Sequence, residues 1–385
     1  MSGIIRPLRE DELVDAIADA ARSGARLAIA GGGSKRAVGC PSPAANMLDM
    51  TGFAGIVDYD PAELVLTVRP GTTLTEVQAL VAERGQMLAF EPFDHGPIFG
   101  DGAGRATIGG VVAAGVAGSQ RVSSGSARDH LLGFRAVSGQ AKPFVAGAKV
   151  VKNVTGYDLP KLAAGSWGRL FAMTELTLKV LPRPRATATL AIHGLDPEQA
   201  VAAMSRAMGS QAELAAAAHF PADLAGGSAM TLLRVQGFES SVAARCTMLD
   251  HLFDGQARLE RVALADRLWD SVRSLEPLGP ELPLWRVNVP PSGGCGVVTR
   301  LCRLGLEKWL FDWAGGLVWL GYDGDPQDVR EAAAEAGGHA TLVRAPEAMR
   351  AAVPAFHPQS PGIVALEARV RRAFDPLAVF ETGRF

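Results

Sequence analysis

The amino-acid sequence predicts an α+β fold in two lobes. With 385 residues, of which 48% are hydrophobic, the chain is longer than one hydrophobic core usually serves. Strand-like and helix-like segments alternate over its first half, and the stretch Leu181-Pro182-Arg183-Pro184 then interrupts that alternation. The segments that follow indicate a mainly antiparallel sheet covered by helices. We therefore place a lobe boundary after residue 183.

The first lobe opens with an amphipathic helix. Leu13, Ile17 and Ala20 lie on one face of this helix, which ends at Gly24. The further elements predicted for this lobe are strands at 26–30, 64–68 and 172–180, and a helix at 74–84 that follows Thr72 or Thr73 as its N-cap and ends before Gly85.

The second lobe is predicted from segments with regular hydrophobic periodicity. The Ala-rich segment 214–218 is expected to be the packing face of a helix. Trp285, Trp309, Trp313 and Trp319 are expected to anchor a core or an interface. The remaining predicted elements are strands at 187–192, 230–235 and 317–322 and helices at 197–208, 241–253 and 363–374.

Charge and composition exclude several classes of function. A net charge of −2, from 38 basic and 40 acidic side chains, provides no field suited to nucleic acid or an acidic membrane. Cys40, Cys246, Cys295 and Cys302 have no paired spacing, so we expect neither a metal site nor an iron–sulfur cluster. The N-terminus has no apolar signal region, and the stretch 109–118 is too short to span a bilayer. We expect a cytoplasmic protein that reaches the inner membrane only through partners.

A glycine-rich loop directly follows the first buried strand. In Gly31-Gly32-Gly33-Ser34-Lys35 the glycines let backbone N–H groups converge on an anion, while Ser34 adds a hydroxyl donor and Lys35 adds charge. Such a loop suits a pyrophosphate, and an ordinary glycine-rich turn is the alternative. A P-loop is excluded because Ser34 precedes Lys35, and a Rossmann fingerprint because no third glycine opens a helix.

A second glycine-rich segment lies between residues 96 and 125, where nine of thirty positions are glycine. In Thr107-Ile108-Gly109-Gly110 and the residues after it, the glycines let the backbone approach a flat ring. Ile108, Val111 and Val112 are expected to pack behind that backbone. The segment is therefore expected to form one wall of a cofactor site. The alternative, a tightly packed helix of small residues over 110–117, is compatible with that use.

Together these segments occur in an order that resembles the PCMH-type FAD domain of the vanillyl-alcohol oxidase superfamily. The resemblance implies a two-part FAD-binding domain at 1–183, an α+β cap domain at 184–354, and a C-terminal segment at 355–385 that returns to the FAD domain. The segments that carry it are 31–34, 107–110, 126–130, 152–159 and 165–168, together with Phe374-Asp375-Pro376 near the C-terminus.

The resemblance also implies where FAD binds. Cys40, near the first glycine-rich loop, and His95, ahead of the second, both lie outside the matched motifs, so FAD is expected to be bound non-covalently. The tail lacks the usual Asn-Pro, which leaves Thr382 as a substitute for a flavin contact from that Asn. The implied contacts are Gly31, Gly32, Gly33, Ser34 and Lys35 at the pyrophosphate, Thr107, Ile108, Gly109, Gly110, Gly115, Gly118 and Ser119 along the flavin, and Gly168 and Phe171 near the adenine.

Within the superfamily, the chain resembles the FAD-binding subunits of bacterial glycolate oxidases, through residues 88–92, 152–158, 284–291 and 312–316. This resemblance implies a subunit of a multi-subunit glycolate oxidase that takes part in flavin-dependent oxidation of glycolate to glyoxylate. The implied partners are a homologous flavoprotein subunit and an iron–sulfur subunit, and the implied substrate is a small 2-hydroxy acid. A self-sufficient FAD-dependent 2-hydroxy-acid dehydrogenase and a non-catalytic flavin-binding scaffold are the alternatives.

No residue pattern identifies a catalytic group. Related flavoenzymes that oxidise 2-hydroxy acids carry a His-rich cluster, whereas the seven histidines here are scattered, and isolated histidines are usually structural. His95 is of interest because it precedes the second glycine-rich segment. Arg128 and Asp129 are expected to fix a loop. Tyr157 is expected either to reach a flavin edge or to anchor its loop.

Overall fold

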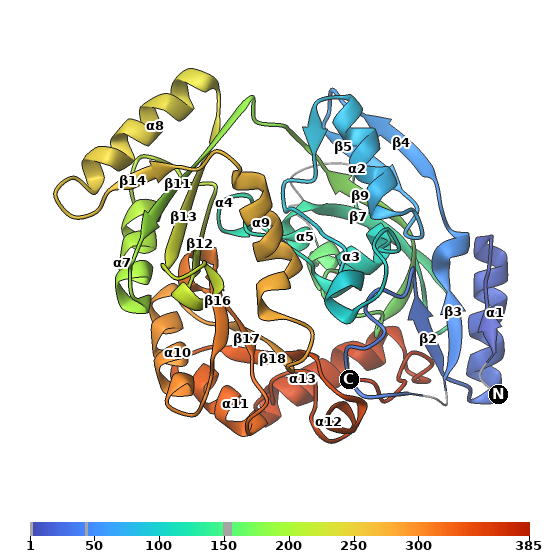
Figure 1. Cartoon of the computed structure of the whole chain (residues 1–385). Coiled ribbons are helices and arrows are strands. Elements are labelled where there is room, and N and C mark those ends of the chain that lie inside the picture. The colour runs from blue at the N-terminus through green and yellow to red at the C-terminus, as the bar shows by residue number, and fades with distance from the viewer. Residues whose placement is uncertain (1–2, 43–44, 149–155) are drawn as a thin grey trace.

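The computed structural model describes residues 3–42, 45–148 and 156–385 and shows two lobes side by side (Figure 1). The first lobe begins with a parallel sheet in the order β1-β3-β2, and α1 (Glu10–Ser23) packs on it through Leu13 and Ile17. Gly24 ends α1 in a left-handed conformation, as predicted. The strands of this sheet are β1 (Ile4–Ile5), β2 (Leu27–Ala30) and β3 (Asn46–Asp49).

An antiparallel five-stranded sheet forms the other half of the first lobe, in the order β4-β5-β9-β7-β8. Thr73 caps α2 (Leu74–Glu83) by accepting a hydrogen bond from the Glu76 N–H. The strands are β4 (Ile56–Asp60), β5 (Val65–Val68), β7 (Leu131–Ser138), β8 (Pro143–Gly147) and β9 (Phe171–Lys179), with the short pair β6 (Gln86–Met87) and β10 (Leu181–Pro182) beside them.

The second lobe contains one antiparallel sheet of eight strands, in the order β14-β11-β13-β12-β16-β17-β15-β18. The expected antiparallel sheet covered by helices, and with it the α+β fold, is confirmed. The strands are β11 (Ala186–His193), β12 (Ala216–Phe220), β13 (Met230–Gly237), β14 (Leu259–Arg261), β15 (Leu284–Asn288), β16 (Lys308–Asp312), β17 (Leu317–Gly321) and β18 (His339–Arg344).

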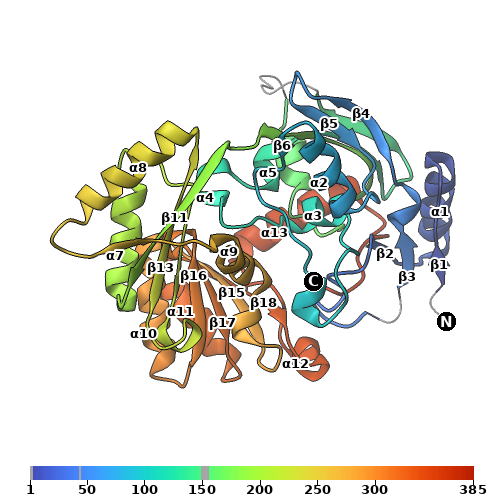
Figure 2. The same ribbon diagram turned by 45° about the horizontal axis from the view of Figure 1, so that its top comes forward.

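Helices cover the outer face of this sheet, and the first lobe approaches its inner face (Figure 2). The outer core contains the fully buried Trp285, whereas the inner core contains Trp313 and Trp319 together with Ile98 from the first lobe. The outer helices are α7 (Pro197–Met208), α8 (Glu239–Leu252), α10 (Gly294–Cys302) and α11 (Pro326–Glu335), while α9 (Ala265–Ser274) lies on the inner face.

One predicted element is wrong. Residues 214–218 were expected to form a helix, but the structure places Ala216–Phe220 in strand β12, between β13 and β16. Ala217 packs into the outer core, while Ala216 and Ala218 pack into the inner core. Because both faces of the strand are buried, its sequence does not alternate between polar and apolar residues. Its run of alanines, which favour helices, therefore suggested a helix.

The C-terminal residues pack against the first lobe. After α12 (Glu347–Ala352), helix α13 (Pro361–Phe374) brings the Phe374 ring to 5.2 Å from that of Phe171. Val379 and Phe380 then enter the core beneath α1. The lobe boundaries at 183 and 354 stay predictions.

Candidate FAD site and the cavity between the lobes

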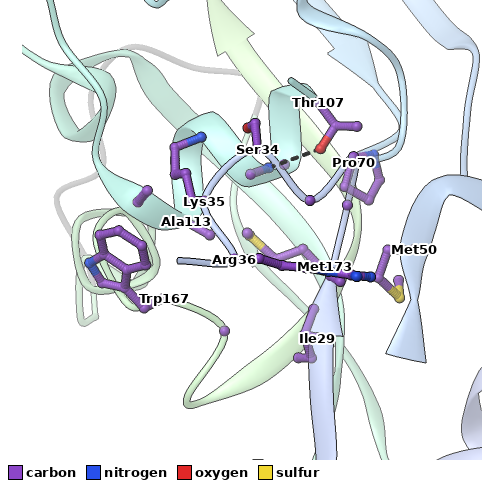
Figure 3. Close-up of a pocket in the computed structure, with 18 of the residues that line it drawn as sticks. Ile29, Ser34, Lys35, Arg36, Met50, Pro70, Thr107, Ala113, Trp167 and Met173 are labelled. Carbon is purple, nitrogen blue, oxygen red and sulfur yellow. Dashed lines mark hydrogen bonds between the residues drawn. The ribbon is translucent and has the colours of Figure 1, made fainter. Parts of the chain in front are cut away.

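A cavity of about 110 Å³, open to solvent, lies in the first lobe, beside the glycine-rich loop that follows β2. We call it the glycine cavity. Figure 3 shows Arg36 extending from the loop toward Met50, whereas Lys35 extends in a different direction. The lining residues are Ile29, Ala30, Gly31, Gly32, Gly33, Ser34, Lys35, Arg36, Met50, Pro70, Thr107, Gly109, Gly110, Ala113, Ala114, Trp167, Gly168, Phe171, Met173 and Arg384.

The loop packs so closely on its neighbours that two positions leave no space for a side chain. A Cβ atom at Gly32 would lie 1.5 Å from the Arg105 carbonyl oxygen, and one at Gly31 would lie 2.2 Å from Thr107 Oγ1. Gly33 has a φ of +79°, in the left-handed region that favours glycine. The backbone N–H groups of residues 32–35 have no acceptor within the described residues. These consecutive donors can bind an anion.

The opposite wall is the start of α3 (Ile108–Ala114). Thr107 caps this helix, and its Oγ1 accepts a hydrogen bond from the Gly110 N–H at 3.3 Å. A Cβ atom at Gly109 would lie 2.5 Å from Pro70 Cβ, so only glycine allows this approach. Ile108 and Val111 are fully buried behind the helix, as predicted.

Positive charge gathers around the glycine cavity. Burial lowers the pKa of Lys35 to about 8, although the nearby Asp94 raises it in part. The ammonium group of Lys35 has no hydrogen bond or ion pair within the described ranges. Burial, together with Arg350 and Arg36, lowers the pKa of Arg384 to about 10. Arg384 Nε donates to the Val38 carbonyl at 2.7 Å. The lining residues include no carboxylate, so the cavity favours an anionic ligand.

The other end of the glycine cavity is apolar. Ile29, Met173 and the aromatic Phe171 form one side, and Trp167 forms the other. Trp167 has a φ of +54° and is followed by Gly168 at +70°, a turn that holds the indole over the cavity. An anion-binding loop joined to an apolar slot suits a nucleotide whose ring packs beside its phosphates.

Two further cavities continue from this one toward the second lobe. A cavity of about 50 Å³, the connecting cavity, shares Ala114 and Trp167 with the glycine cavity and reaches His95 and Arg286. A larger one of about 850 Å³, the inter-lobe cavity, shares Gly115 and Arg286 with the connecting cavity. The three cavities are therefore neighbours, from the glycine-rich loop to the junction of the lobes.

Side chains from both lobes line the inter-lobe cavity. Arg121 lies on α4 (Arg121–Ser124), whereas Arg286 lies on β15. His339 and His357 reach the same cavity from β18 and from the segment before α13. Burial, and then Arg286, lowers the pKa of His339, which keeps its imidazole neutral and able to accept a proton at neutral pH. Histidines that are far apart in sequence thus meet at one cavity.

The structure brings most of the predicted cofactor residues together. Ile108 lies behind the cavity wall, Gly115 lines the connecting and inter-lobe cavities, and Gly118 and Ser119 lie at the lobe junction. The predicted residues that line the glycine cavity are Gly31, Gly32, Gly33, Ser34, Lys35, Thr107, Gly109, Gly110, Gly168 and Phe171. Their contact with FAD stays a prediction.

Several lining residues were missed from the sequence. Arg384 reaches the loop from the far end of the chain, and Met50 and Met173 come from separate strands or turns. For Trp167, the sequence pointed only to the neighbouring Gly168 as a site residue. Arg121 and Arg286 were not predicted as site residues, because no spacing connects them.

The other residues singled out in the sequence have different environments. His95 is half-buried, and its ring stacks on that of Phe93 at 4.5 Å. Desolvation holds its pKa well below the usual value, and its buried Nδ1 has no hydrogen-bond partner among the described residues. Asp129 fixes its loop by accepting hydrogen bonds from Ser126, as expected. Tyr157 is 91% exposed, and the segment 152–155 lies outside the described residues.

Within the described ranges, no group of three or more His, Cys, Asp or Glu side chains is arranged to hold a metal ion. Among the helices described, none has the length and apolarity needed to cross a bilayer.

Comparisons with known proteins agree with this geometry. Residues 1–146 match the family model described as FAD binding domain. The glycolate oxidase subunit GlcE of Escherichia coli K12 is 34% identical over 360 residues, which cover 93% of this chain and 92% of that protein. The glycolate oxidase subunit GlcD of Bacillus subtilis 168 is 27% identical over 49% of this chain and 38% of its own length. The prediction of FAD as the cofactor is confirmed.

A solved structure shows the same fold. p-Cresol methylhydroxylase with substrate bound matches 99% of this chain and 88% of its own chain, with a TM-score of 0.74 and 13% identity. The predicted PCMH-type architecture is therefore confirmed.

Proposed function

Because the chain belongs to the family of the glycolate oxidase subunit GlcE, we propose that it is an FAD-binding subunit of a multi-subunit glycolate oxidase. It takes part in the oxidation of glycolate to glyoxylate. The observation that carries the proposal is the 34% identity, which extends over both lobes rather than over the FAD-binding part alone.

The glycine cavity fits FAD. The N–H groups of residues 32–35 and the ammonium group of Lys35, none of which has a partner in the part of the chain that the structure describes, suit a pyrophosphate, which carries two negative charges. The apolar slot beside Phe171 and Met173 suits the adenine. A Cβ atom at Gly31 or Gly32 would displace this cradle, because glycine is required where the loop packs against Thr107 and Arg105.

FAD, when bound, supplies a two-electron acceptor for the oxidation. The protein itself binds and orients the FAD. We propose Gly31 to Lys35 at the pyrophosphate, Thr107 to Gly110 and Gly115 along the path to the flavin, and Gly168 and Phe171 near the adenine. Gly118 and Ser119 join the lobes and thereby support that path. Cys40 lines none of the three cavities, whereas His95 lines the connecting cavity, and FAD held without a covalent bond stays part of the proposal.

The proposal includes partners. The matched GlcE and GlcD proteins are both named as subunits of glycolate oxidase, which supports a complex that contains a homologous flavoprotein. We extend it to an iron–sulfur subunit that passes electrons onward, and to a cytoplasmic location with contact to the inner membrane through partners. The domain boundaries at 183 and 354 belong to the same proposal.

The test is glycolate-dependent flavin reduction, followed anaerobically by stopped-flow absorbance. The FAD-loaded chain alone should be reduced slowly, and addition of the partner subunits should accelerate reduction. Rapid and complete reduction by glycolate without partners would replace the subunit proposal with a self-sufficient dehydrogenase. An absence of reduction in the assembled complex would point to a structural flavin.

A further inference from the structure

Two guanidinium groups lie close to the indole of Trp313 on the wall of the inter-lobe cavity. The Arg121 guanidinium carbon is 4.3 Å from the centre of the Trp313 ring, and that of Arg286 is 5.1 Å from it. Arg121 comes from the first lobe and Arg286 from the second, and all three residues line the cavity. Stacking on one indole holds the two cations close together despite their repulsion.

The backbone around Trp313 is built to hold the indole in this place. Trp313, Ala314 and Gly315 have φ values of +52°, +56° and +95°, which is strained for the two residues that carry a side chain. Asp312 accepts hydrogen bonds from the Trp313 N–H at 2.8 Å and from Ser119 Oγ at 2.9 Å. Trp313 Nε1 donates to the Gly118 carbonyl at 3.0 Å. These bonds fix the indole to both lobes.

Neither guanidinium group is neutralised. Other arginines near this junction are paired, as Arg234 is with Glu91 at 2.8 Å and Arg169 with Glu367 at 2.7 Å. Within the described residues, Arg121 and Arg286 have no hydrogen bond or ion pair through their side chains. Arg286 is half-buried and Arg121 is exposed to the cavity, so a ligand can reach both.

The nearby acidic group does not serve as a counter-ion. The Asp312 carboxylate is occupied by Ser119 and the Trp313 N–H, and burial raises its pKa to about 7, which weakens its negative charge at neutral pH. Burial and Arg121 lower the pKa of Arg286 to about 10, so it remains a cation. Asp129 and Asp312 act on Arg121 and Arg286 at longer range, but neither forms an ion pair with them among the described residues, so the guanidinium donors on this wall have no protein acceptor there.

We propose that Arg286 and Arg121 form a carboxylate-binding site, through which this chain holds a small 2-hydroxy acid of its own. A guanidinium group presents parallel N–H donors that match the two oxygens of a carboxylate. Asn288, Thr341 and His339 line the same cavity and offer polar atoms for a hydroxyl group. The identity of the acid rests on the proposed function, whereas the site rests on the geometry around Trp313.

The test is calorimetric binding of oxalate, a two-carbon acid that flavin cannot oxidise at an alcohol carbon, to the purified FAD-loaded chain. Arg286→Lys keeps the charge but loses the parallel donors, and Arg121→Gln loses the charge on the exposed cavity wall. Each should weaken oxalate binding about tenfold or more. Arg128→Gln removes another cation from the same cavity without approaching Trp313, and should leave the affinity within about twofold.

The outcomes separate this site from the proposed function. Unchanged oxalate affinity in both Arg286→Lys and Arg121→Gln would overturn the site, even if glycolate reduces the flavin in the complex. Equal weakening by Arg128→Gln would also overturn it, in favour of a diffuse positive cavity. Oxalate binding that depends on Arg286 and Arg121 would support the site, even if glycolate never reduces the flavin. Quenching of tryptophan fluorescence by oxalate, lost in Arg121→Gln, gives a second readout beside Trp313.

Discussion

The glycine cavity and the inter-lobe cavity both attract anions, but they do so with different parts of the chain. The first uses backbone N–H groups of consecutive residues, held by glycines that approach Arg105 and Thr107. The second uses the side chains of Arg121 and Arg286, which belong to different lobes and meet at Trp313. Local backbone packing therefore determines the shape of the glycine cavity, whereas the docking of the two lobes determines the shape of the inter-lobe cavity. Substitutions should therefore act separately on the two.

The largest effect is expected from Gly32→Ala. The added Cβ atom would lie 1.5 Å from a backbone carbonyl, so the loop and residue 105 must move apart. We expect almost complete loss of bound FAD, measured as the ratio of flavin to protein absorbance after purification. Gly85→Ala is the control, because its φ of +64° adds a backbone strain that Gly32 does not have, while nothing lies within 4 Å of an added Cβ atom. The control should lose about 1 kcal/mol of stability and keep its FAD; equal FAD loss in both would contradict a specific role for the loop.

A smaller effect is expected from Lys35→Met. Removing a cation that faces the pyrophosphate should weaken FAD binding about 10- to 100-fold, the range of a charge-assisted hydrogen bond. In the FAD-free protein the same change should raise stability, because the buried ammonium group has no partner among the described residues. Fluorescence titration and urea denaturation would measure the two effects, and weaker FAD binding without any gain in FAD-free stability would count against this interpretation of Lys35.

The gain in stability should depend on pH. The folded-state pKa of Lys35, about 8, lies below its usual 10.5, so folding disfavours the charged form. This penalty, of up to about 3 kcal/mol, is present below pH 8 and disappears as the pH rises toward 10.5. The stability difference between Lys35→Met and the unaltered FAD-free protein should therefore shrink over that interval. A constant difference would show that Lys35 is not desolvated.

Asp312→Asn tests the lobe junction over a different pH interval. Burial raises the pKa of Asp312 from 3.8 to about 7, so the protonated form is favoured in the folded state. Its stabilising contribution is complete below about pH 4 and is lost as the pH rises through 7. Asn resembles the protonated form, so the variant should match the natural protein near pH 4 and exceed its stability by up to about 4 kcal/mol at pH 8. Equal melting curves at both pH values would contradict this.

The smallest effect is expected from Tyr157→Phe. The side chain is 91% exposed and lies outside all three cavities. FAD affinity should be unchanged, and stability should stay within about 0.5 kcal/mol. A clear shift in the flavin spectrum of this variant would instead favour contact between Tyr157 and the flavin edge.

Much of the fold follows from local patterns. The helix Pro197–Met208 has the predicted bounds, since Asp196 provides a capping box before it and Pro197 starts it. Strand β12 could not be predicted in this way, because burial of both faces removes the alternation that identifies a strand. Its neighbours in the sheet, which sequence periodicity does not reveal, decide its conformation.

The same distinction applies to the sites. Gly31 to Lys35 were predictable because consecutive residues form the loop. Arg384 was not, since it reaches the Lys35 carbonyl from 349 positions along the chain. The pair formed by Arg121 and Arg286 depends on how two lobes meet, and His339 and His357 join them from further segments. Such convergence leaves no fixed spacing in the sequence.

The central claim is that the glycine cavity holds FAD by its pyrophosphate. Titrating the folded, FAD-free chain with FAD, and following flavin fluorescence and calorimetric heat, tests it most directly. The account predicts one FAD per chain, competition by ADP because ADP carries the same pyrophosphate, and weakening of both ligands in Lys35→Met. A folded chain that binds no FAD, or that binds FAD without competition from ADP, would contradict it.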